Sequence, residues 1–248
     1  MSSSFVANTL TSPPGFYGKL LSHGDFVSRR LPRQFIDIWD RWLQGAMAAG
    51  EEKLPGKWLD CYLQAPIWRF ALGSGVCGQT PWLGVLMPSV DKVGRHFPLT
   101  IAIPIPAGVA LNDTLALSDR WFGQLEDLAL STLEADFNID QFEGELTNVP
   151  LRLCPQPRGF LGFGERGIKA PSGVVWLLPS EQMRLQFLFQ STYPVWSHFR
   201  LDGYSLWTSA GAEQIYPALA ISSGLPSTEQ STALINGDWV GVGWRVER

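Results

Sequence analysis

The chain has 248 residues and a mass of 27.5 kDa, a length that fits one large domain. Hydrophobic residues make up 45% of it and charged residues 17%, and eleven Trp and fourteen Phe supply large core side chains, which excludes a disordered chain. The formal net charge of −4 is spread without long blocks of one sign, so the sequence offers no basic surface suited to nucleic acid.

The N-terminal segment differs in composition from the rest of the chain. Residues 1–12 are rich in Ser, Thr and Asn and precede a Pro-Pro-Gly turn, so we expect a flexible tail over 1–12 and a single domain over 13–248. No basic stretch followed by an apolar one is present, which argues against a secretory signal. The most apolar stretch is interrupted by Pro104 and Pro106 and is too short to span a bilayer. We therefore expect a cytoplasmic protein without membrane insertion.

A first amphipathic helix is expected over residues 32–49. Apolar side chains recur at spacings of three and four through this stretch, Pro32 suits the first helical turn, and Gly50 suits a C-terminal cap. Trp39 and Trp42 lie three positions apart, where side-chain directions diverge by about 60°. This spacing predicts that one ring is buried against a sheet and that the other lies near the sheet edge.

Three short apolar segments follow, at 67–72, 82–87 and 98–103. Few polar residues alternate within them, so they predict strands that are covered on both faces. Ser118 then precedes a second stretch with helical periodicity. That stretch predicts a helix over 119–136 with Ser118 as its N-cap.

The second half of the chain has less regular patterns. Residues 138–172 are dense in Pro and Gly and predict a long irregular loop. A short helix over 227–234 is expected to end at Asn236-Gly237. Helices interleaved with buried strands indicate an α/β fold, with a mixed β-sheet flanked by helices in a three-layer α/β/α sandwich. The further strands are expected at 174–178, 184–190, 203–208 and 239–246.

The sequence indicates no cofactor and no metal. Cys61, Cys77 and Cys154 are odd in number and widely spaced, which predicts reduced, mostly buried thiols rather than disulfides or a zinc site. The stretch GFLGFGERG at 159–167 lacks the spacing of a phosphate-binding loop. The HGD sequence at 23–25 fits a capping carboxylate beside a surface histidine better than a metal site.

Two segments combine charged residues with glycine turns. They are GFYGKLLSHGDFVSRRLPRQF at 15–35 and MPSVDKVGRHFPLT at 87–100. Because acids and bases flank turns beside apolar stretches in both, their charges can neutralise one another across a shared groove, and we expect the segments to lie close together. The candidate interaction residues are Lys19, Asp25, Arg29, Arg30, Ser89, Asp91, Arg95 and His96.

Three interpretations of the sequence at 88–97 remain open. Its charges can pair internally to hold a turn, or they can line a recognition surface, which predicts an exposed apolar patch with Arg at its rim. Alternatively, a small hydrolase or ligand-binding enzyme would bring four of these side chains together in a cleft, although no GxSxG turn is present. The four side chains are those of Ser89, Asp91, Arg95 and His96.

The order of motifs also resembles a known family. GFYGKL and GDFVSRRLP, a helix with WDRWL, and then MPSVDKVGRHFPL are similar to the type VI secretion-associated TagF family, also called ImpM. These motifs lie in the first 105 residues, and GYSLWT at 203–208 is similar further along. Family members usually have a proline after the leucine in GKLP, where this chain has Leu21.

The resemblance implies a cytoplasmic accessory protein encoded with a type VI secretion apparatus. Its implied role is post-translational repression of assembly or firing, with the forkhead-associated scaffold protein of that system as partner. Some relatives are fused to a PP2C-type phosphatase, for which this chain is too short. We therefore expect a protein-binding regulator rather than an enzyme, with a structural subunit of the apparatus as a further alternative.

Overall fold

The computed structural model describes residues 9–107, 109–154, 173–177 and 201–247. Their main feature is a nine-stranded sheet with the order β11-β8-β10-β9-β4-β5-β6-β2-β3. β11 pairs with β8 in parallel and the other neighbours pair antiparallel, so the sheet is mixed. Its strands are β2 (Gly15–Gly18), β3 (Val27–Arg29), β4 (Trp68–Leu72), β5 (Trp82–Met87), β6 (Leu99–Pro104), β8 (Val174–Leu177), β9 (Tyr204–Ser209), β10 (Ala218–Ser223) and β11 (Arg245–Glu247).

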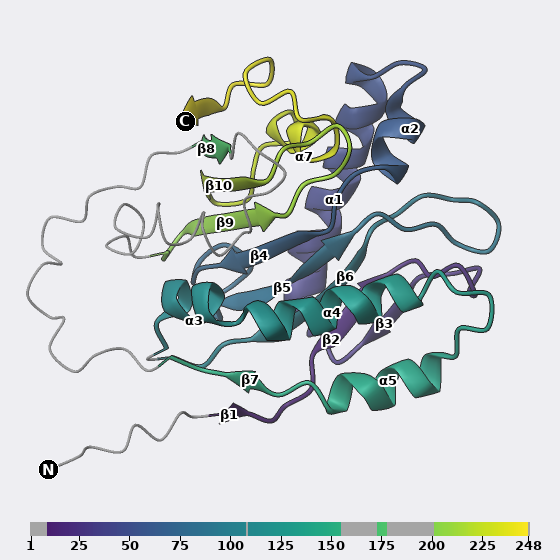
Figure 1. The fold of residues 1–248 in the computed structure, drawn as a ribbon, viewed down its shortest axis with the longest axis vertical. Helices are drawn as coiled ribbons and strands as arrows, with labels where there is room; N and C mark the ends of the chain where they lie inside the picture. Colours follow the sequence, from purple (N-terminus) through teal and green to yellow (C-terminus); the bar gives the residue numbers. More distant parts are fainter. Residues whose placement is uncertain (1–8, 108, 155–172, 178–200, 248) are drawn as a thin grey trace, which may run out of the picture.

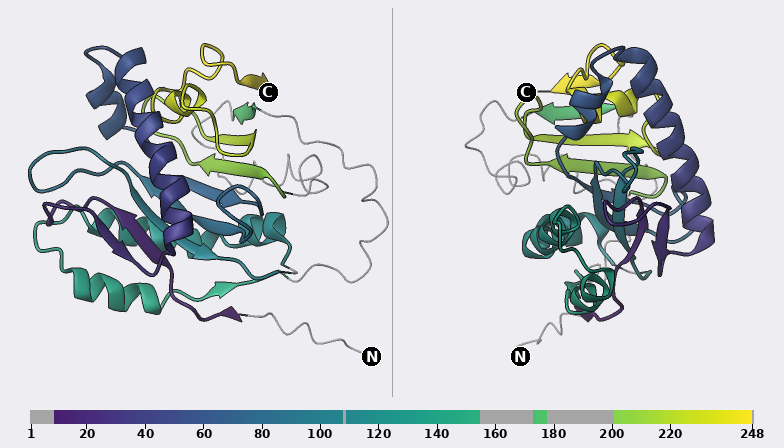
Figure 2. Two further views of the ribbon diagram at one scale, coloured as in Figure 1. Left: turned by 180° about the vertical axis from the view of Figure 1, so that it is seen from behind. Right: turned by 90° about the vertical axis from the view of Figure 1, so that its right-hand side faces the viewer.

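Helices cover both faces of this sheet. Long helix α1 lies on one face, and α4 and α5 lie on the other, which the right-hand view of Figure 2 shows edge-on. This arrangement, also visible in Figure 1, confirms the expected single α/β domain with a mixed sheet flanked by helices. The helices are α1 (Arg33–Lys53), α2 (Trp58–Leu63), α3 (Leu111–Leu117), α4 (Asp119–Ser131), α5 (Ile139–Thr147), the 3-10 helix η2 (Gln230–Thr232) and α7 (Ala233–Asn236).

The central strands agree with the sequence patterns. β4 and β5 are buried along their whole length, and β6 is buried up to its last residue. Two apolar clusters fill the spaces between the layers: α1 contributes Phe35 and Trp39 to one, and α4 contributes Phe122 and Leu125 to the other. The prediction of strands covered on both faces is confirmed.

Both tryptophans of α1 are buried, so the prediction that one lies near the sheet edge was wrong. Trp39 is 0% exposed and Trp42 is 8% exposed. Trp39 Nε1 donates a hydrogen bond of 2.8 Å to Thr100 Oγ1 on the sheet, and Trp42 Nε1 donates one of 2.8 Å to the carbonyl oxygen of Pro226. The C-terminal part of the chain covers the ring that helical spacing placed at an edge.

The ends of the two long helices differ from the predicted ends. α1 continues through Gly50 to Lys53, so Gly50 does not end the helix. The indole of Trp58 packs against the backbone of Gly50, where an added Cβ atom would collide with it. α4 ends at Ser131 instead of 136, and the side chain of Ser118 makes no capping hydrogen bond. Among the large apolar residues that continue the periodic pattern beyond this end, Leu133 is 43% exposed and Phe137 packs against the core from the segment that follows α4.

A helix occupies part of the segment predicted to be an irregular loop. Asn138 caps α5, since its side-chain oxygen accepts hydrogen bonds from the backbone N–H groups of Asp140 and Gln141. Phe142 and Leu146 on α5 are buried against the sheet. The loop prediction was therefore wrong for α5 and for residues 151–152, which form a strand, and residues 155–172 lie outside the described part.

The N-terminal tail prediction was wrong for two residues. β1 (Thr9–Leu10) pairs antiparallel with β7 (Leu151–Arg152) and forms a separate two-stranded sheet. Residues 1–8 lie outside the described part of the chain. The pairing ties the start of the described chain to the strand that follows α5 (Figure 1).

The C-terminal half agrees in part with the predicted elements. β8 and β9 match two expected strands, and α7 ends as expected at Gly237, whose φ of 73° suits glycine. β10 was not predicted, and of the strand expected at 239–246 only Arg245 and Val246 are extended, in β11. The strand expected at 184–190 lies outside the described residues.

The described residues contain no helix with the length and apolar character needed to cross a membrane. The three cysteines are free thiols, as predicted; Cys77 is buried, whereas Cys61 and Cys154 are only partly buried.

Candidate functional site

The two charged segments meet at one end of the sheet. β5 runs into the turn at 88–98 that leads to β6, and β2 runs antiparallel to β6, so the chain leaves β2 at the same end. In Figure 1 both connections extend from the same side of the molecule. The predicted turn is confirmed by an isolated antiparallel bridge between Val90 and His96.

Asp91 organises the turn with its side chain. Its Oδ1 accepts hydrogen bonds from the backbone N–H groups of Val93 at 3.0 Å and Arg95 at 2.8 Å. Its Oδ2 accepts from Arg95 Nε at 2.7 Å and lies 3.0 Å from the ammonium group of Lys19. The Asp91 side chain is 0% exposed and that of Lys19 is 7% exposed, so this ion pair is buried.

These contacts set the charge state of Asp91. Burial alone would raise the pKa of the carboxyl group, but the hydrogen bond from the Arg95 backbone, with those from Lys19, the Arg95 side chain and the Val93 backbone, outweighs burial and holds the pKa well below its ordinary value. Asp91 is thus a permanently ionised carboxylate near neutral pH. Such a group is suited to holding cations in place rather than to exchanging protons.

The turn also holds the connection between β2 and β3. The backbone N–H of Lys92 donates to the carbonyl oxygen of His23 at 3.0 Å, and the Arg95 guanidinium donates to the carbonyl oxygen of Gly24. Arg95 Nη2 also lies 3.9 Å from the fully exposed carboxylate of Asp25. The prediction that the two segments lie close together is confirmed.

Ser89 and His96 have structural partners that differ from those of a catalytic site. The Ser89 hydroxyl donates to the carbonyl oxygen of Lys19 at 2.8 Å, and its backbone exchanges hydrogen bonds with the Tyr62 hydroxyl. The His96 ring lies edge-on to Trp58 and Tyr62, with centroids 5.6 and 5.8 Å away. Among the described contacts, no hydrogen bond joins Ser89 or Asp91 to the His96 ring.

Arg29 and Arg30 belong to a different contact. Arg29 Nε lies 3.0 Å from one carboxylate oxygen of Glu143 on α5, and Arg30 Nη1 lies 3.7 Å from the other. Arg30 Nε also donates to the carbonyl oxygen of Pro14 at 2.9 Å. These two arginines tie α5 to the end of β3 and do not join the Asp91 cluster.

Exposed apolar side chains lie on the same two connections. Phe26 is 48% exposed; its ring stacks on Tyr17, with centroids 5.6 Å apart, and meets the edge of Phe97. Leu21 is 38% exposed and Val93 is 70% exposed. Beside them, Lys92 is exposed and the Arg95 side chain is 57% exposed. We call this set the tip surface, formed by Leu21, Phe26, Lys92, Val93 and Arg95.

Comparison with known proteins places this chain in a family. The model of the TagF N-terminal domain, described as type VI secretion system-associated, matches residues 15–149. The chain belongs to the TagF family. A solved structure of PA0076 from Pseudomonas aeruginosa PAO1 is 38% identical, with a TM-score of 0.71, over 91% of this chain and 94% of that one. No curated protein matches the chain.

The region matched to the TagF model contains every candidate residue predicted from the sequence. It also contains Phe26 and Val93, which the sequence analysis missed as parts of the site, and Glu143, the missed partner of Arg29 and Arg30. Phe26 and Val93 lie in loops. Hydrophobic periodicity indicates the buried faces of helices and strands, so it gives no sign of an exposed apolar residue in a loop. Glu143 is far along the chain from Arg29, and a single sequence contains no signal that pairs them.

The described residues of this TagF-family chain contain no group of three or more His, Cys, Asp or Glu side chains that could hold a metal ion. The site consists of the buried Lys19–Asp91 ion pair and the exposed, partly apolar surface that it supports. Such an arrangement can present a fixed shape to a partner, because each loop is held to the other by charged and backbone hydrogen bonds.

Proposed function

We propose that this chain is a cytoplasmic regulator of a type VI secretion system that represses assembly or firing after translation by binding another protein. The proposed partner is the forkhead-associated scaffold protein of that system, and the proposed contact is the tip surface. Its role is binding, without catalysis. Membership of the TagF family supports the link to secretion.

The observation that carries the proposal is the composition of the tip surface. An interface needs apolar side chains that lose water on binding and a polar rim that fixes orientation. Phe26 and Val93 supply exposed apolar area, and Arg95 and Lys92 supply cationic groups beside it. Because the buried Asp91 carboxylate holds Lys19, the Arg95 side chain and two backbone N–H groups of the turn, the turn has less conformational freedom to lose when a partner binds.

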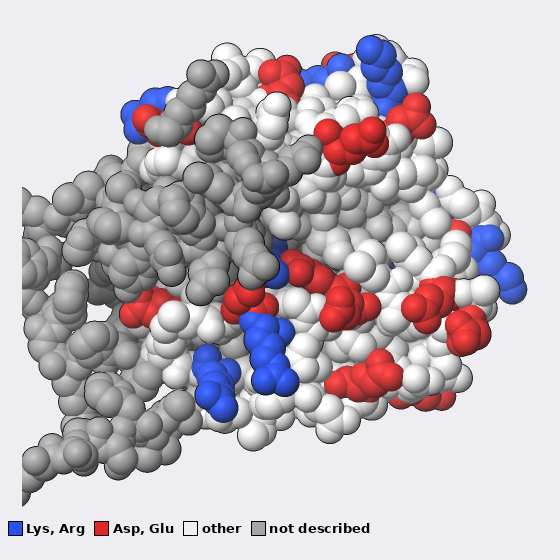
Figure 3. Space-filling model, viewed as in Figure 1, with Lys and Arg blue, Asp and Glu red and all other residues white. Residues whose placement is uncertain are grey.

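Charge on the rest of the molecule favours the same region. The face over α4 and α5 carries mostly acidic side chains in Figure 3, and exposed acids on these helices include Asp127, Asp140 and Glu145. An acidic partner would be repelled by that face, whereas Lys92 and Arg95 would attract it. The proposed partner surface is therefore acidic and apolar.

A matched pair of variants tests this proposal. Val93→Glu adds a charge to the tip surface, and Val240→Glu adds one to an equally exposed valine in the C-terminal part, since the two side chains are 70% and 73% exposed. We expect Val93→Glu to weaken binding to the purified scaffold protein at least tenfold and to release secretion in cells, while Val240→Glu behaves as wild type. Equal binding of both variants to the scaffold would overturn the tip surface as the contact.

A further inference from the structure

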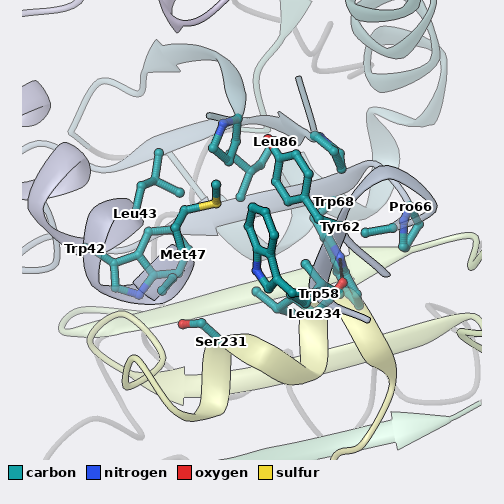
Figure 4. A pocket seen from close by; sticks show the side chains of 15 residues that line it. Trp42, Leu43, Met47, Trp58, Tyr62, Pro66, Trp68, Leu86, Ser231 and Leu234 are labelled. Atoms are coloured by element: carbon teal, nitrogen blue, oxygen red, sulfur yellow. Dashed lines mark hydrogen bonds between the residues drawn. The ribbon is translucent and has the colours of Figure 1, made fainter. Parts of the chain in front are cut away.

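The apolar space under α2 leaves little room for a ligand. Side chains that include Trp58, Tyr62 and Trp68 pack around it between α1, α2 and α7 (Figure 4), and the cavity among them is about 50 Å³. Small-molecule sites usually have roughly 300 Å³ or more. This packing instead supports the tip surface, because the Tyr62 hydroxyl holds the backbone of Ser89. Backbone groups that can bind another chain lie at the edge of the sheet.

β3 forms one edge of the nine-stranded sheet. Among the described strands, β2 is its one neighbour. The carbonyl oxygen of Arg29 points toward β2, since a Cβ atom added to Gly15 would lie 2.7 Å from it. The backbone groups of successive residues in a strand point in opposite directions, so the N–H and C=O of Ser28 point away from the sheet. In agreement, the carbonyl oxygen of Ser28 accepts a hydrogen bond of 2.9 Å from the guanidinium of Arg29 at the surface.

The side chains along this edge alternate between the two faces of the sheet. Val27 belongs to the apolar cluster on the side of α4, and Arg29 points to the same side, toward α5. Phe26 lies on the opposite side, where its ring stacks on Tyr17. Ser28 shares this side with Phe26, and both residues are exposed. A strand laid beside β3 would therefore place a side chain next to the ring of Phe26, which is part of the tip surface.

The charge at this edge is positive, although the whole chain has a formal net charge of −4. Residues 28–33 read SRRLPR and contain no acid. Arg29 and Arg30 share one carboxylate, that of Glu143, so one positive charge at the end of β3 is left without a carboxylate partner among the described residues. The Arg29 side chain is 53% exposed and can reach a further acidic group. This edge therefore favours an acidic segment over a basic one.

We propose that the partner of the tip surface binds through an extended segment that adds a strand to the sheet beside β3. The inference rests on the proposed function, because it specifies how the same partner binds. The outward N–H and C=O of Ser28 select a strand, since an extended backbone offers an acceptor and a donor side by side. Successive side chains of the segment lie on opposite faces, so one is apolar and packs on Phe26, and the next is acidic and lies beside Arg29.

Amide hydrogen exchange at Ser28 tests the new backbone hydrogen bond directly. In the free chain this N–H faces solvent and should exchange fast, whereas the N–H groups of Val27 and Arg29 face β2 and should be protected. NMR on the isotope-labelled full chain follows the three amides before and after addition of the purified scaffold protein. We expect exchange at Ser28 to slow at least tenfold in the complex. Unchanged exchange at Ser28 in a complex that forms would overturn the added strand.

A pair of proline variants tests the same edge by binding. Ser28→Pro removes the outward N–H and leaves the hydrogen bonds to β2 in place, a position where edge strands accept proline. Val246→Pro is the matched control at the opposite edge of the sheet. There the N–H of Arg245 donates to Gly173 beside β8, so the N–H of Val246 points away from β8. Ser28→Pro should bind the scaffold protein at least tenfold more weakly, whereas Val246→Pro should bind it as wild type does.

The outcomes separate the added strand from the proposed function. Binding that is weakened in Val93→Glu but kept in Ser28→Pro would overturn the added strand and leave the tip surface as the contact. A scaffold protein that does not bind the wild-type chain would overturn both. If Ser28→Pro fails to fold, exchange at Ser28 decides alone. Exchange at Ser28 that slows with rising concentration of the chain by itself would show that a second copy occupies the edge, which also overturns the proposal.

Discussion

Lys19 Nζ lies 3.0 Å from Asp91 Oδ2, and the two side chains are 7% and 0% exposed. The pair joins residues that are far apart in sequence but adjacent at one end of the sheet. A buried ion pair can contribute little net stability, yet the loss of one partner leaves the other charge buried without compensation. The pair therefore makes the two connections interdependent.

Asp91→Asn should lower the thermal midpoint of unfolding. The substitution keeps the shape of the side chain but removes the charge that neutralises Lys19 and Arg95. Differential scanning calorimetry measures the effect, and Asp25→Asn is the control because the Asp25 side chain is fully exposed. Equal midpoints for the two variants would contradict a supporting role for Asp91.

The stability of the wild-type chain should depend on Asp91 in acid. Since the folded state lowers the pKa of this carboxyl group, its stabilising contribution is complete above the unfolded pKa of about 3.9 and is lost as the pH falls further below it. Urea unfolding followed between pH 6 and pH 3 should show a smaller loss of stability for Asp91→Asn than for wild type. A parallel loss in both proteins would contradict the lowered pKa.

Gly18→Ala should destabilise the fold by about 2 kcal/mol or more. Gly18 has a φ of 142°, a backbone angle that residues other than glycine rarely adopt. An added Cβ atom would also collide with the carbonyl oxygen of Pro98. Gly24→Ala, in the same connection, is the matched control, since no atom lies within 4 Å of its added Cβ. Its free energy of unfolding should stay within about 0.5 kcal/mol of wild type.

Arg95→Glu should lower the thermal midpoint by about 4 °C or more, because it places a second carboxylate beside Asp91 and removes the contact to Gly24. This variant therefore tests folding more than recognition. Lys92→Glu reverses a charge on the tip surface, while its backbone contact to His23 can persist. We expect Lys92→Glu to melt as wild type and to bind the scaffold protein more weakly; unchanged binding would show that Lys92 lies outside the contact.

Local patterns predicted the elements whose environment is uniform. β4, β5 and β6 are buried on both faces, so their predominantly apolar sequences were sufficient to place them. α5 was missed because its helical stretch is short, contains Gly144 and lies beside a proline-rich sequence. Its stability comes from the cap at Asn138 and from packing of Phe142 against the sheet.

The candidate site was predicted in location but only partly in composition. Glycine turns with opposite charges correctly indicated that Asp91 and Arg95 meet the connection after β2. The assignment of Arg29 to the same cluster could not be settled, because its partner Glu143 is brought near only by the packing of α5. The burial of Trp42 depended likewise on Pro226, which is distant in sequence.

The pairing of β4 with β9 has a consequence for truncated forms of the gene product. β9 lies outside the region matched by the family model. Because β9 pairs with β4, β4 is an interior strand of the sheet. The indole of Trp68 on β4 also donates to the carbonyl oxygen of Leu234 in the C-terminal part of the chain. A fragment that stops after residue 154 would leave β4 as an unpaired edge that is apolar except for Arg69, with the indole of Trp68 uncovered. Such an edge recruits other chains, so the fragment should accumulate as aggregate instead of acting as a minimal regulator.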